Sequence, residues 1–377
     1  MSASSSLDAG DRVAAGRGPS IPAFRVARSK RMHLYVLIVC VIIVAVLASV
    51  PLWSQVGTSR TLVTLFWLVA LAQMWNLLGG FAGLISVGQQ AYIGIGAYGL
   101  WLLADEFHLH PFVAVIGAAA LAALVALPIA PLLFRLRGGY FAIGTWVFAE
   151  ITRIVVSNIQ ATGGGSGITI ISAARIPFET RIPGTYWVGL TVAVGSVLIV
   201  YFLLRSKIGL GLTAIRDNDL AAQSSGVNVF RSKLIVYVIA AFGCGAMGAV
   251  VALNLLFIQP SASFDITWTA FAIFIVVIGG FGSIEGPLIG AVIFFALQQT
   301  LSQHGQTYML LLGAIAVVMA TVAPRGIWGL VVARWDLHLF PVRRGLVMQS
   351  PPERAEPASA GEADAAADAS SRKEVAP

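Results

Sequence analysis

The stretch YWVGLTVAVGSVLIVYFLL, residues 186–204, is mostly apolar and free of charge, and the polar stretch IRDNDLAAQSSGVNVFRSK, residues 215–233, follows it. A helix of about 20 apolar residues crosses the hydrocarbon core of a bilayer, so residues 186–204 and the next apolar run, 232–257, are predicted membrane spans. As a helix, the polar stretch would reach about 28 Å, far more than a turn between neighbouring spans requires. The sequence therefore indicates a segment outside the membrane with a role of its own.

Composition indicates an integral membrane protein. The 377 residues are 58% hydrophobic and only 11% charged, with a mean hydropathy of +0.85, whereas soluble domains carry about 25% charged residues. The net charge of +7 does not indicate nucleic-acid binding, because the basic residues flank apolar runs and form no aromatic-studded patch. Cys40 and Cys244 each lie in an apolar run, so we expect neither a disulfide framework nor a metal site.

Apolar runs of spanning length recur along the chain. We predict spans near residues 33–52, 61–79, 85–103, 112–134, 140–158, 186–204, 232–257, 267–282, 286–303 and 305–323. The predicted fold is an all-α polytopic membrane protein with about ten transmembrane helices, or as few as eight if two short segments are re-entrant.

Charge distribution predicts the orientation. With a cytoplasmic N-terminus, the positive-inside rule is satisfied, since one set of basic residues then faces the cytoplasm: Arg135, Arg137, Arg205, Lys207, Arg216, Arg231, Lys233, Arg325, Arg334, Arg343 and Arg344. Asp105, Glu106 and residues 159–185 then lie outside. The expected location is the inner or plasma membrane, with both termini cytoplasmic.

Three regions follow from these predictions. Residues 1–32 are a basic cytoplasmic tail and residues 345–377, rich in Ala, Pro and acidic residues, are a second cytoplasmic tail; both compositions predict disorder. Residues 33–335 form the transmembrane domain, which includes a cytoplasmic loop at about 205–233.

The polar stretch is predicted to contain a short helix. Asp217 to Asp219 supply capping oxygens and negative charge for a helix N-terminus, Ala221 and Ala222 favour helix, and Gly226 favours the left-handed conformation that ends one. The small residues suit docking on another protein. The alternative interpretation is a solvated loop that only fixes topology.

Six segments combine glycines or polar residues with apolar runs. They are NLLGGFAGLISVGQQAYIGIGAYGL (76–100), LRGGYFAIGTWVFAEITRIVVSN (136–158), TGGGSGI (162–168), AIRDNDLAAQSSGVNVFRSKL (214–234), IGGFGSIEGPLIGA (278–291) and LLGAIAVVMATVAPRGIWGL (311–330). In order and spacing they resemble the branched-chain amino acid ABC permease family, specifically its LivM-like subunits. The resemblance covers about residues 60–335 and implies an ABC importer permease fold.

The resemblance also implies partners. Family members pair with a second, LivH-like permease, dock two cytoplasmic ATPases at their coupling loops, and receive substrate from an extracytoplasmic binding protein. Arg216, Asp217, Asp219, Ala221, Ala222 and Gly226 are the implied coupling residues. Importer loops often carry Glu before the two alanines, where this chain has Leu220.

The chain itself is not expected to be an enzyme. A Walker A loop places lysine after glycine, but all four lysines here follow Ser or Arg. We expect ATP and Mg²⁺ to bind partner subunits, and this chain to bind no cofactor.

Polar side chains inside predicted spans are candidates for the translocation path. Ser86, Gln89, Gln90 and Tyr92 lie in a glycine-rich segment and offer hydrogen bonds to a passing zwitterion. In the alternative interpretation the glycines let helices pack closely.

Glu150 and Arg153 stand three residues apart in a predicted helix, where they can pair. They are either part of the path or a structural brace.

Further along, Gly286 and Pro287 predict a tight turn in the segment 278–291, with helix disfavoured at Gly286.

Two further functions remain open from the sequence. A permease of the same family for urea or short amides fits the same motifs. An ion-coupled secondary transporter, with Glu150 as the coupling carboxylate, is a more distant alternative.

Overall fold

The computed structural model describes residues 24–26, 30–301, 307–323, 326–335 and 346–348. The helices are α1 (Lys30–Trp53), α2 (Val56–Asn76), α3 (Gln89–Trp101), α4 (Pro111–Leu133), α5 (Gly139–Asn158), α6 (Ile171–Ala174), α7 (Phe178–Arg205), α8 (Lys207–Asp217), α9 (Asp219–Ser224), α10 (Val229–Leu255), α11 (Pro260–Ser263), α12 (Thr267–Gly279), α13 (Glu285–Leu301), α14 (Thr307–Val322) and α15 (Gly326–Trp335). Two π-helical segments, η1 (Leu77–Phe81) and η2 (Leu102–Glu106), and two 3₁₀ turns, η3 (Gln160–Thr162) and η4 (Gly164–Ser166), complete the helical elements.

Six helical stretches among the described residues have the length and apolar composition of a membrane span. They are Val56–Phe81, Pro111–Leu133, Gly139–Asn158, Phe178–Arg205, Val229–Leu255 and Pro260–Gly279. Shorter apolar stretches occur at Ile38–Trp53 and Leu310–Met319, and α3 and α13 have 13 and 17 residues. The structure confirms an all-α membrane protein, whereas ten crossings stay a prediction.

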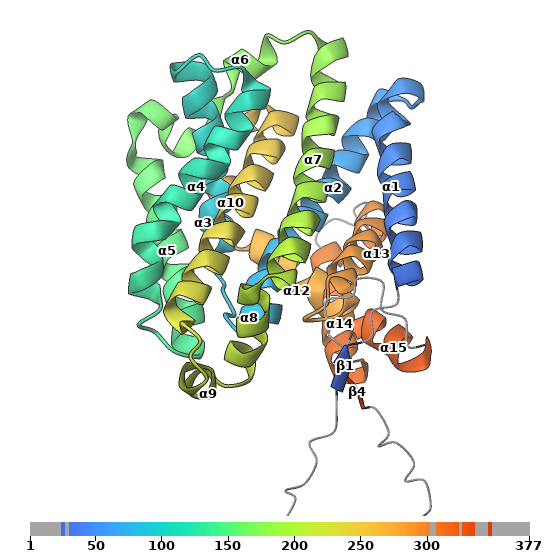
Figure 1. Cartoon of the computed structure of the whole chain (residues 1–377). Helices are drawn as coiled ribbons and strands as arrows, with labels where there is room; N and C mark the ends of the chain where they lie inside the picture. The colour runs from blue at the N-terminus through green and yellow to red at the C-terminus, as the bar shows by residue number, and fades with distance from the viewer. Residues whose placement is uncertain (1–23, 27–29, 302–306, 324–325, 336–345, 349–377) are drawn as a thin grey trace, which may run out of the picture. The chain divides into compact units, whose positions relative to one another are not determined.

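Helix α10 is central to the unit Arg31–Val342 and packs most extensively against α4 and α3 (Figure 1). Glycines allow the backbones to meet: a Cβ atom at Gly96 would lie 2.0 Å from the carbonyl oxygen of Gly245, and one at Gly248 would lie 2.0 Å from that of Ile93. Small residues at a crossing are how membrane helices gain close packing without a hydrophobic driving force.

The glycine-rich segment after α2 is irregular. The α-helix ends at Asn76, π-helix η1 follows, and residues 83–88 have no regular structure before α3 begins. Neighbouring side chains satisfy the free backbone: the Trp75 indole donates to the Ser86 carbonyl at 2.9 Å, and the Val87 amide donates to the Thr145 hydroxyl at 3.0 Å. Unpaired backbone groups are too costly in hydrocarbon, so this break depends on the helices around it. It also corrects the predicted span at 85–103, because helix begins only at Gln89.

Several connections gather at the end of the unit where α8 and α9 lie, opposite α6 (Figure 1). The rings of Phe134, after α4, and Phe230, in α10, are 5.9 Å apart, so the turn carrying Arg135 and Arg137 lies beside the start of α10. At the other end, the Asp105 carboxylate accepts the backbone amides of Ile171 and Ser172, both at 2.8 Å.

Some sequence boundaries are wrong. The predicted connection 159–185 contains α6 and the first turns of α7. Helix α13 begins at Glu285 and includes Gly286, because Pro287 lies in the first helical turn, where an amide has no helical acceptor to lose. The turn between α12 and α13 is therefore short.

Two small antiparallel strand pairs occur among the described residues. Strand β2 (Ile168–Thr169) pairs with β3 (Phe257–Ile258). Strand β1 (Phe24–Val26) pairs with β4 (Leu346–Met348) in a separate unit. Apart from these short segments and the start of α1, the predicted disordered tails 1–32 and 345–377 lie outside the described residues.

Candidate functional site

The predicted coupling loop folds as two consecutive helices, α8 and α9. Helix α8 is amphipathic, since Leu212 and Ile215 are buried on one face while Lys207 and Leu210 are exposed. The single residue Asn218 separates α8 from α9. We call residues 207–226 the coupling segment.

Helix α9 has the predicted start and end signals. The Asn218 side-chain oxygen accepts the amides of Leu220 and Ala221 at 2.9 and 3.1 Å, as an N-cap residue does. At the other end, Gly226 has a φ of +82° and its amide donates to the Gln223 carbonyl at 2.9 Å. A left-handed glycine closing a helix in this way confirms the predicted short helix.

The predicted coupling residues differ in exposure. Ala222 is buried, whereas Ala221 and Gly226 are exposed and Leu220, at the position where importers often have Glu, is 71% exposed. The exposed surface of α9 therefore carries Leu220 and Ala221 beside polar side chains, which are those of Asp219, Gln223 and Ser224.

Charged residues hold the coupling segment to the rest of the chain. Asp219 pairs with Lys233 of α10 at 2.5 Å, and the Asp217 side chain is mostly exposed and pairs with Arg216 at 3.5 Å. The Arg216 guanidinium also donates to the Gly80 carbonyl at 3.1 Å.

The four polar candidates of the glycine-rich segment all lie in the interior. Ser86, Gln89, Gln90 and Tyr92 are each at most 1% exposed. The Gln89 side-chain oxygen accepts from the Cys244 thiol at 3.1 Å, Gln90 accepts from the Thr269 hydroxyl, and Tyr92 donates to the Tyr237 hydroxyl at 3.0 Å. Among the described residues, the buried Gln89 Nε2 has no hydrogen-bond partner.

Glu150 and Arg153 form the predicted ion pair on α5. The Arg153 Nε atom lies 3.1 and 3.0 Å from the two carboxylate oxygens of Glu150. The pair is not buried between helices, because 43% of the Glu150 side chain and 33% of the Arg153 side chain are exposed. Helix α5 is also the least buried of the six spanning stretches.

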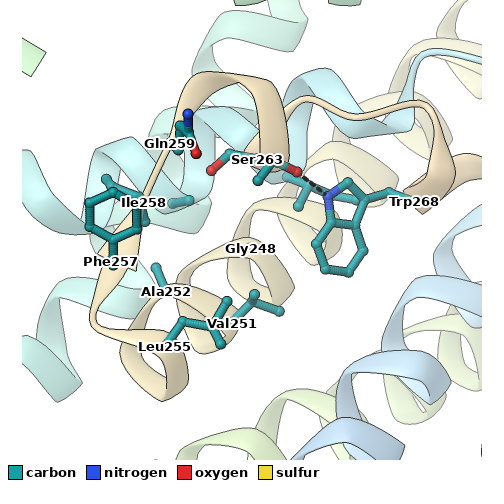
Figure 2. Close-up of a pocket in the computed structure, with 12 residues that line it drawn as sticks. Gly248, Val251, Ala252, Leu255, Phe257, Ile258, Gln259, Ser263 and Trp268 are labelled. Atoms are coloured by element: carbon teal, nitrogen blue, oxygen red, sulfur yellow. Dashed lines mark hydrogen bonds between the residues drawn. The ribbon is translucent and has the colours of Figure 1, made fainter. Parts of the chain in front are cut away.

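An apolar cavity of about 250 Å³ lies between α3, α10 and residues 257–268. Phe257 and Trp268 flank it on opposite sides, with Val251 and Leu255 of α10 below (Figure 2). The Trp268 indole is fixed by a 2.8 Å hydrogen bond to the Ala262 carbonyl. None of the polar candidates above lines this cavity.

Sequence reasoning missed α8 and the cavity. The pattern Ile208, Leu212, Ile215 is a helical apolar stripe, but Gly209 and Gly211 within it obscure the signal. The cavity is formed by segments far apart in the sequence, so no local pattern indicates it. Among the described residues, no group of three or more His, Cys, Asp or Glu side chains is placed to hold a metal.

The fold is that of a polytopic membrane permease. Long apolar helices pack around α10, one span is broken and stabilised by neighbouring side chains, and a short amphipathic segment lies at one end. Residues 57–320 match the family described as "Branched-chain amino acid transport system / permease component". The chain therefore belongs to this family.

Relatives agree with the family assignment. The chain is 30% identical over 283 residues to the high-affinity branched-chain amino acid transport system permease protein LivM of Salmonella typhimurium, and 30% identical over 282 residues to LivM of Escherichia coli. Each match covers 67% of this chain and 65% of the relative, so the chain spans just under two thirds of the length of these proteins. The ribose import permease protein RbsC of Haemophilus influenzae is 26% identical over 168 residues, covering 43% of this chain and 51% of the relative. No solved structure matches the chain.

Proposed function

We propose that this chain is the permease subunit of an ABC uptake system for branched-chain amino acids. The family match over residues 57–320 carries the proposal, and the coupling segment lies inside the matched region. The partners are a second, LivH-like permease, two cytoplasmic ATPases that bind ATP and Mg²⁺, an extracytoplasmic binding protein, and the lipid bilayer.

We propose that the chain lies in the inner or plasma membrane and crosses it ten times. Both termini then lie in the cytoplasm. Basic residues at the end that carries α8 and the turn after α4 support it. The antiparallel pairing of β1 with β4 also supports it, since paired strands lie on one side of the membrane.

In this proposal the coupling segment binds an ATPase. The outward face of α9, with Leu220, Ala221 and Gly226, enters a cleft of the partner, while Arg216, Asp217 and Asp219 orient the segment. Ala221 and Gly226 are small and exposed, which permits close approach. Only Asn218 separates α9 from α8, so movement of one helix should displace the other.

The cavity favours an aliphatic substrate. Its lining is almost entirely apolar, and in the proposed orientation it lies in the outer half, where a binding protein delivers its ligand. A ribose or urea path needs several hydrogen-bond partners in place of water, so these alternatives have less support.

Substrate class is tested by uptake. Proteoliposomes holding the complete transporter, with the binding protein outside and ATP inside, should accumulate leucine, isoleucine or valine and leave ribose and urea outside. The binding protein can be screened by its thermal shift with each compound. Leucine, isoleucine or valine should raise its thermal midpoint, and ribose and urea should not. Selective uptake of urea or ribose would reject the proposed substrate.

An ion-coupled secondary transporter predicts a different result. It would move solute with this chain alone, driven by a proton or sodium gradient. We expect the chain alone to move none, and gradient-driven uptake without ATPases would overturn the proposed function.

The exposed ion pair suggests where the path lies. Helix positions rise 1.5 Å per residue, so Glu150 lies about 17 Å along α5, near mid-span. Charged side chains are costly against lipid, whereas water or protein can solvate them. We therefore propose that the α5 flank bearing Glu150 and Arg153 faces the path shared with the second permease.

The buried polar side chains of the glycine-rich segment complete the proposed path. Ser86, Gln89, Gln90 and Tyr92 stay candidates. Movement of α3 away from α10 would free the hydrogen bonds of Gln89 and Tyr92 for a zwitterion, and movement away from α12 would free that of Gln90. Gln89 Nε2, already unpaired among the described residues, suits a carboxylate.

Replacing both Glu150 and Arg153 by Gln should preserve assembly and lower transport about tenfold, because charged hydrogen bonds are lost without leaving an unpaired charge. Transport and complex yield are measured together. Ile151→Gln, an exposed polar substitution on the same helix, is the control and should transport normally. Loss of folded protein in the double variant would instead identify the pair as a brace.

A further inference from the structure

Two loops far apart in the sequence are bound together at the end of α2. The Asn76 side-chain oxygen accepts the Gly282 amide at 3.0 Å, and its amide nitrogen donates to the Ser283 carbonyl at 2.8 Å. One turn earlier, Gln73 donates to the Ile284 carbonyl at 2.8 Å. The end of α2 thus holds the turn between α12 and α13 at three backbone positions.

The contact between these loops leaves no room for side chains. A Cβ atom at Gly80 would lie 2.2 Å from the Asn76 side-chain oxygen and 2.9 Å from the Gly282 amide. Gly282 itself has a φ of +72°, which favours glycine. The π-helix η1 and the α12–α13 turn therefore pack backbone against backbone and form one unit, which we call the paired loops (residues 77–81 and 280–284).

Arg216 of the coupling segment reaches the paired loops. It lies in the last turn of α8, and its Nη1 atom donates to the Gly80 carbonyl at 3.1 Å. A Cβ atom at Gly282 would lie 3.0 Å from the same Nη1 atom, and one at Gly83 would lie 3.5 Å from the Arg216 Cα. The guanidinium therefore contacts η1 at a carbonyl and lies against the α12–α13 turn at once.

We propose that Arg216 is the positioning residue through which movement of the coupling segment is delivered to the paired loops. This inference rests on the proposed function of the coupling segment as the ATPase docking element. A displaced α8 draws the Gly80 carbonyl with it, and the Asn76 hydrogen bonds make the α12–α13 turn follow.

The local structure suits this role. A π-helix is rare and occurs frequently at functional sites, so η1 is a suitable element to move with the coupling segment. Arginine presents several donors in a rigid planar fork, which keeps a directed bond to a backbone carbonyl. The neighbouring Asp217 carboxylate, 3.5 Å from Arg216 Nε, orients the fork.

The test follows backbone amide hydrogen exchange in the complete transporter, with and without nucleotide trapped in the ATPases. In the wild type, exchange of residues 77–84 and 280–284 should change on trapping. In Arg216→Gln the change should disappear at both loops, while Arg216→Lys, which keeps one charged donor, should retain part of it. Arg231→Gln is the matched control, because it replaces an exposed arginine in the first turn of α10, close in sequence to the coupling segment. It should respond as the wild type does.

Transport provides the second readout. Substrate moved per ATP hydrolysed should fall about tenfold or more in Arg216→Gln, the change expected from loss of one charged hydrogen bond, with the complex still assembled. A purely structural role would lower complex yield, transport and ATP hydrolysis together. That result, or an undiminished exchange response in Arg216→Gln, would overturn the inference. If branched-chain amino acids are not transported but the exchange response still requires Arg216, the substrate proposal fails and this inference stands.

Discussion

Gly226→Arg is expected to leave the subunit folded in the membrane and to abolish transport-coupled ATP hydrolysis. Gly226 follows α9 at its exposed end, and a Cβ atom there would meet no heavy atom within 4 Å. The first atom of an arginine side chain therefore displaces nothing, and the exposed position leaves the rest of the side chain free to extend outward. It projects instead from the outward face of α9, where it blocks the cleft that this face is proposed to enter.

The left-handed backbone at Gly226 requires a second variant, which separates the effect of backbone strain from that of side-chain bulk. With a φ of +82°, position 226 costs an L-residue about 1–2 kcal/mol, whether the side chain is large or small. Gly226→Ala adds this cost without the bulk. We expect Gly226→Ala to retain most of its coupled activity and Gly226→Arg to retain none.

The measurements are membrane level, co-purification with the ATPases, and ATP hydrolysis stimulated by the loaded binding protein. Normal stimulation in Gly226→Arg would count against docking at α9. An equal loss of stimulated ATP hydrolysis in both variants would show that coupling depends on the left-handed turn at residue 226 and not on the free space beyond it.

Helix α9 is a feature that the local sequence alone predicts. Within nine residues, Asn218 starts the helix, the two alanines favour its continuation and Gly226 ends it. Each acts on backbone groups no more than three residues away. Such signals do not depend on the rest of the fold. The Glu150–Arg153 pair was predictable for the same reason, since one helical turn brings the two side chains together.

Features set by distant contacts were not predictable. The start of α3 at Gln89 depends on the Trp75 and Thr145 hydrogen bonds to residues 86 and 87. The exposure of the ion pair depends on which helices cover α5. The contact of Arg216 with Gly80 joins residues 136 positions apart, and a single sequence carries no signal for it.

Burial of the polar path candidates also changes how the glycines are understood. The glycine-rich sequence left open whether these residues line a path or allow close packing. For Gly96 and Gly248 the structure shows close packing, whereas the path role of Ser86, Gln89, Gln90 and Tyr92 stays a prediction. The two roles are compatible, because a crossing made of backbone contacts can separate without rearranging side chains.

Gly96→Ala is expected to destabilise the folded protein strongly, although it adds a single methyl group. The new Cβ atom would lie 2.0 Å from the Gly245 carbonyl oxygen and 2.6 Å from its carbonyl carbon. Both belong to the backbone of α10, so no side-chain rotation relieves the overlap and the two helices must move apart. Since α10 is the central helix, separation disturbs its contacts with α4 as well.

The expected loss for Gly96→Ala is about 3 kcal/mol or more, at or above the upper end for overpacking, and Gly248→Ala, facing the Ile93 carbonyl at 2.0 Å, should behave alike. Gly195→Ala is the matched control: it lies in α7, where a Cβ atom meets no heavy atom within 4 Å, and alanine is the better helix former. Thermal midpoints in detergent and the yield of monodisperse protein should therefore fall for Gly96→Ala and Gly248→Ala and stay level or rise for Gly195→Ala. Wild-type stability in Gly96→Ala would mean that α3 and α10 do not cross in backbone contact, because that contact leaves no volume for the methyl group.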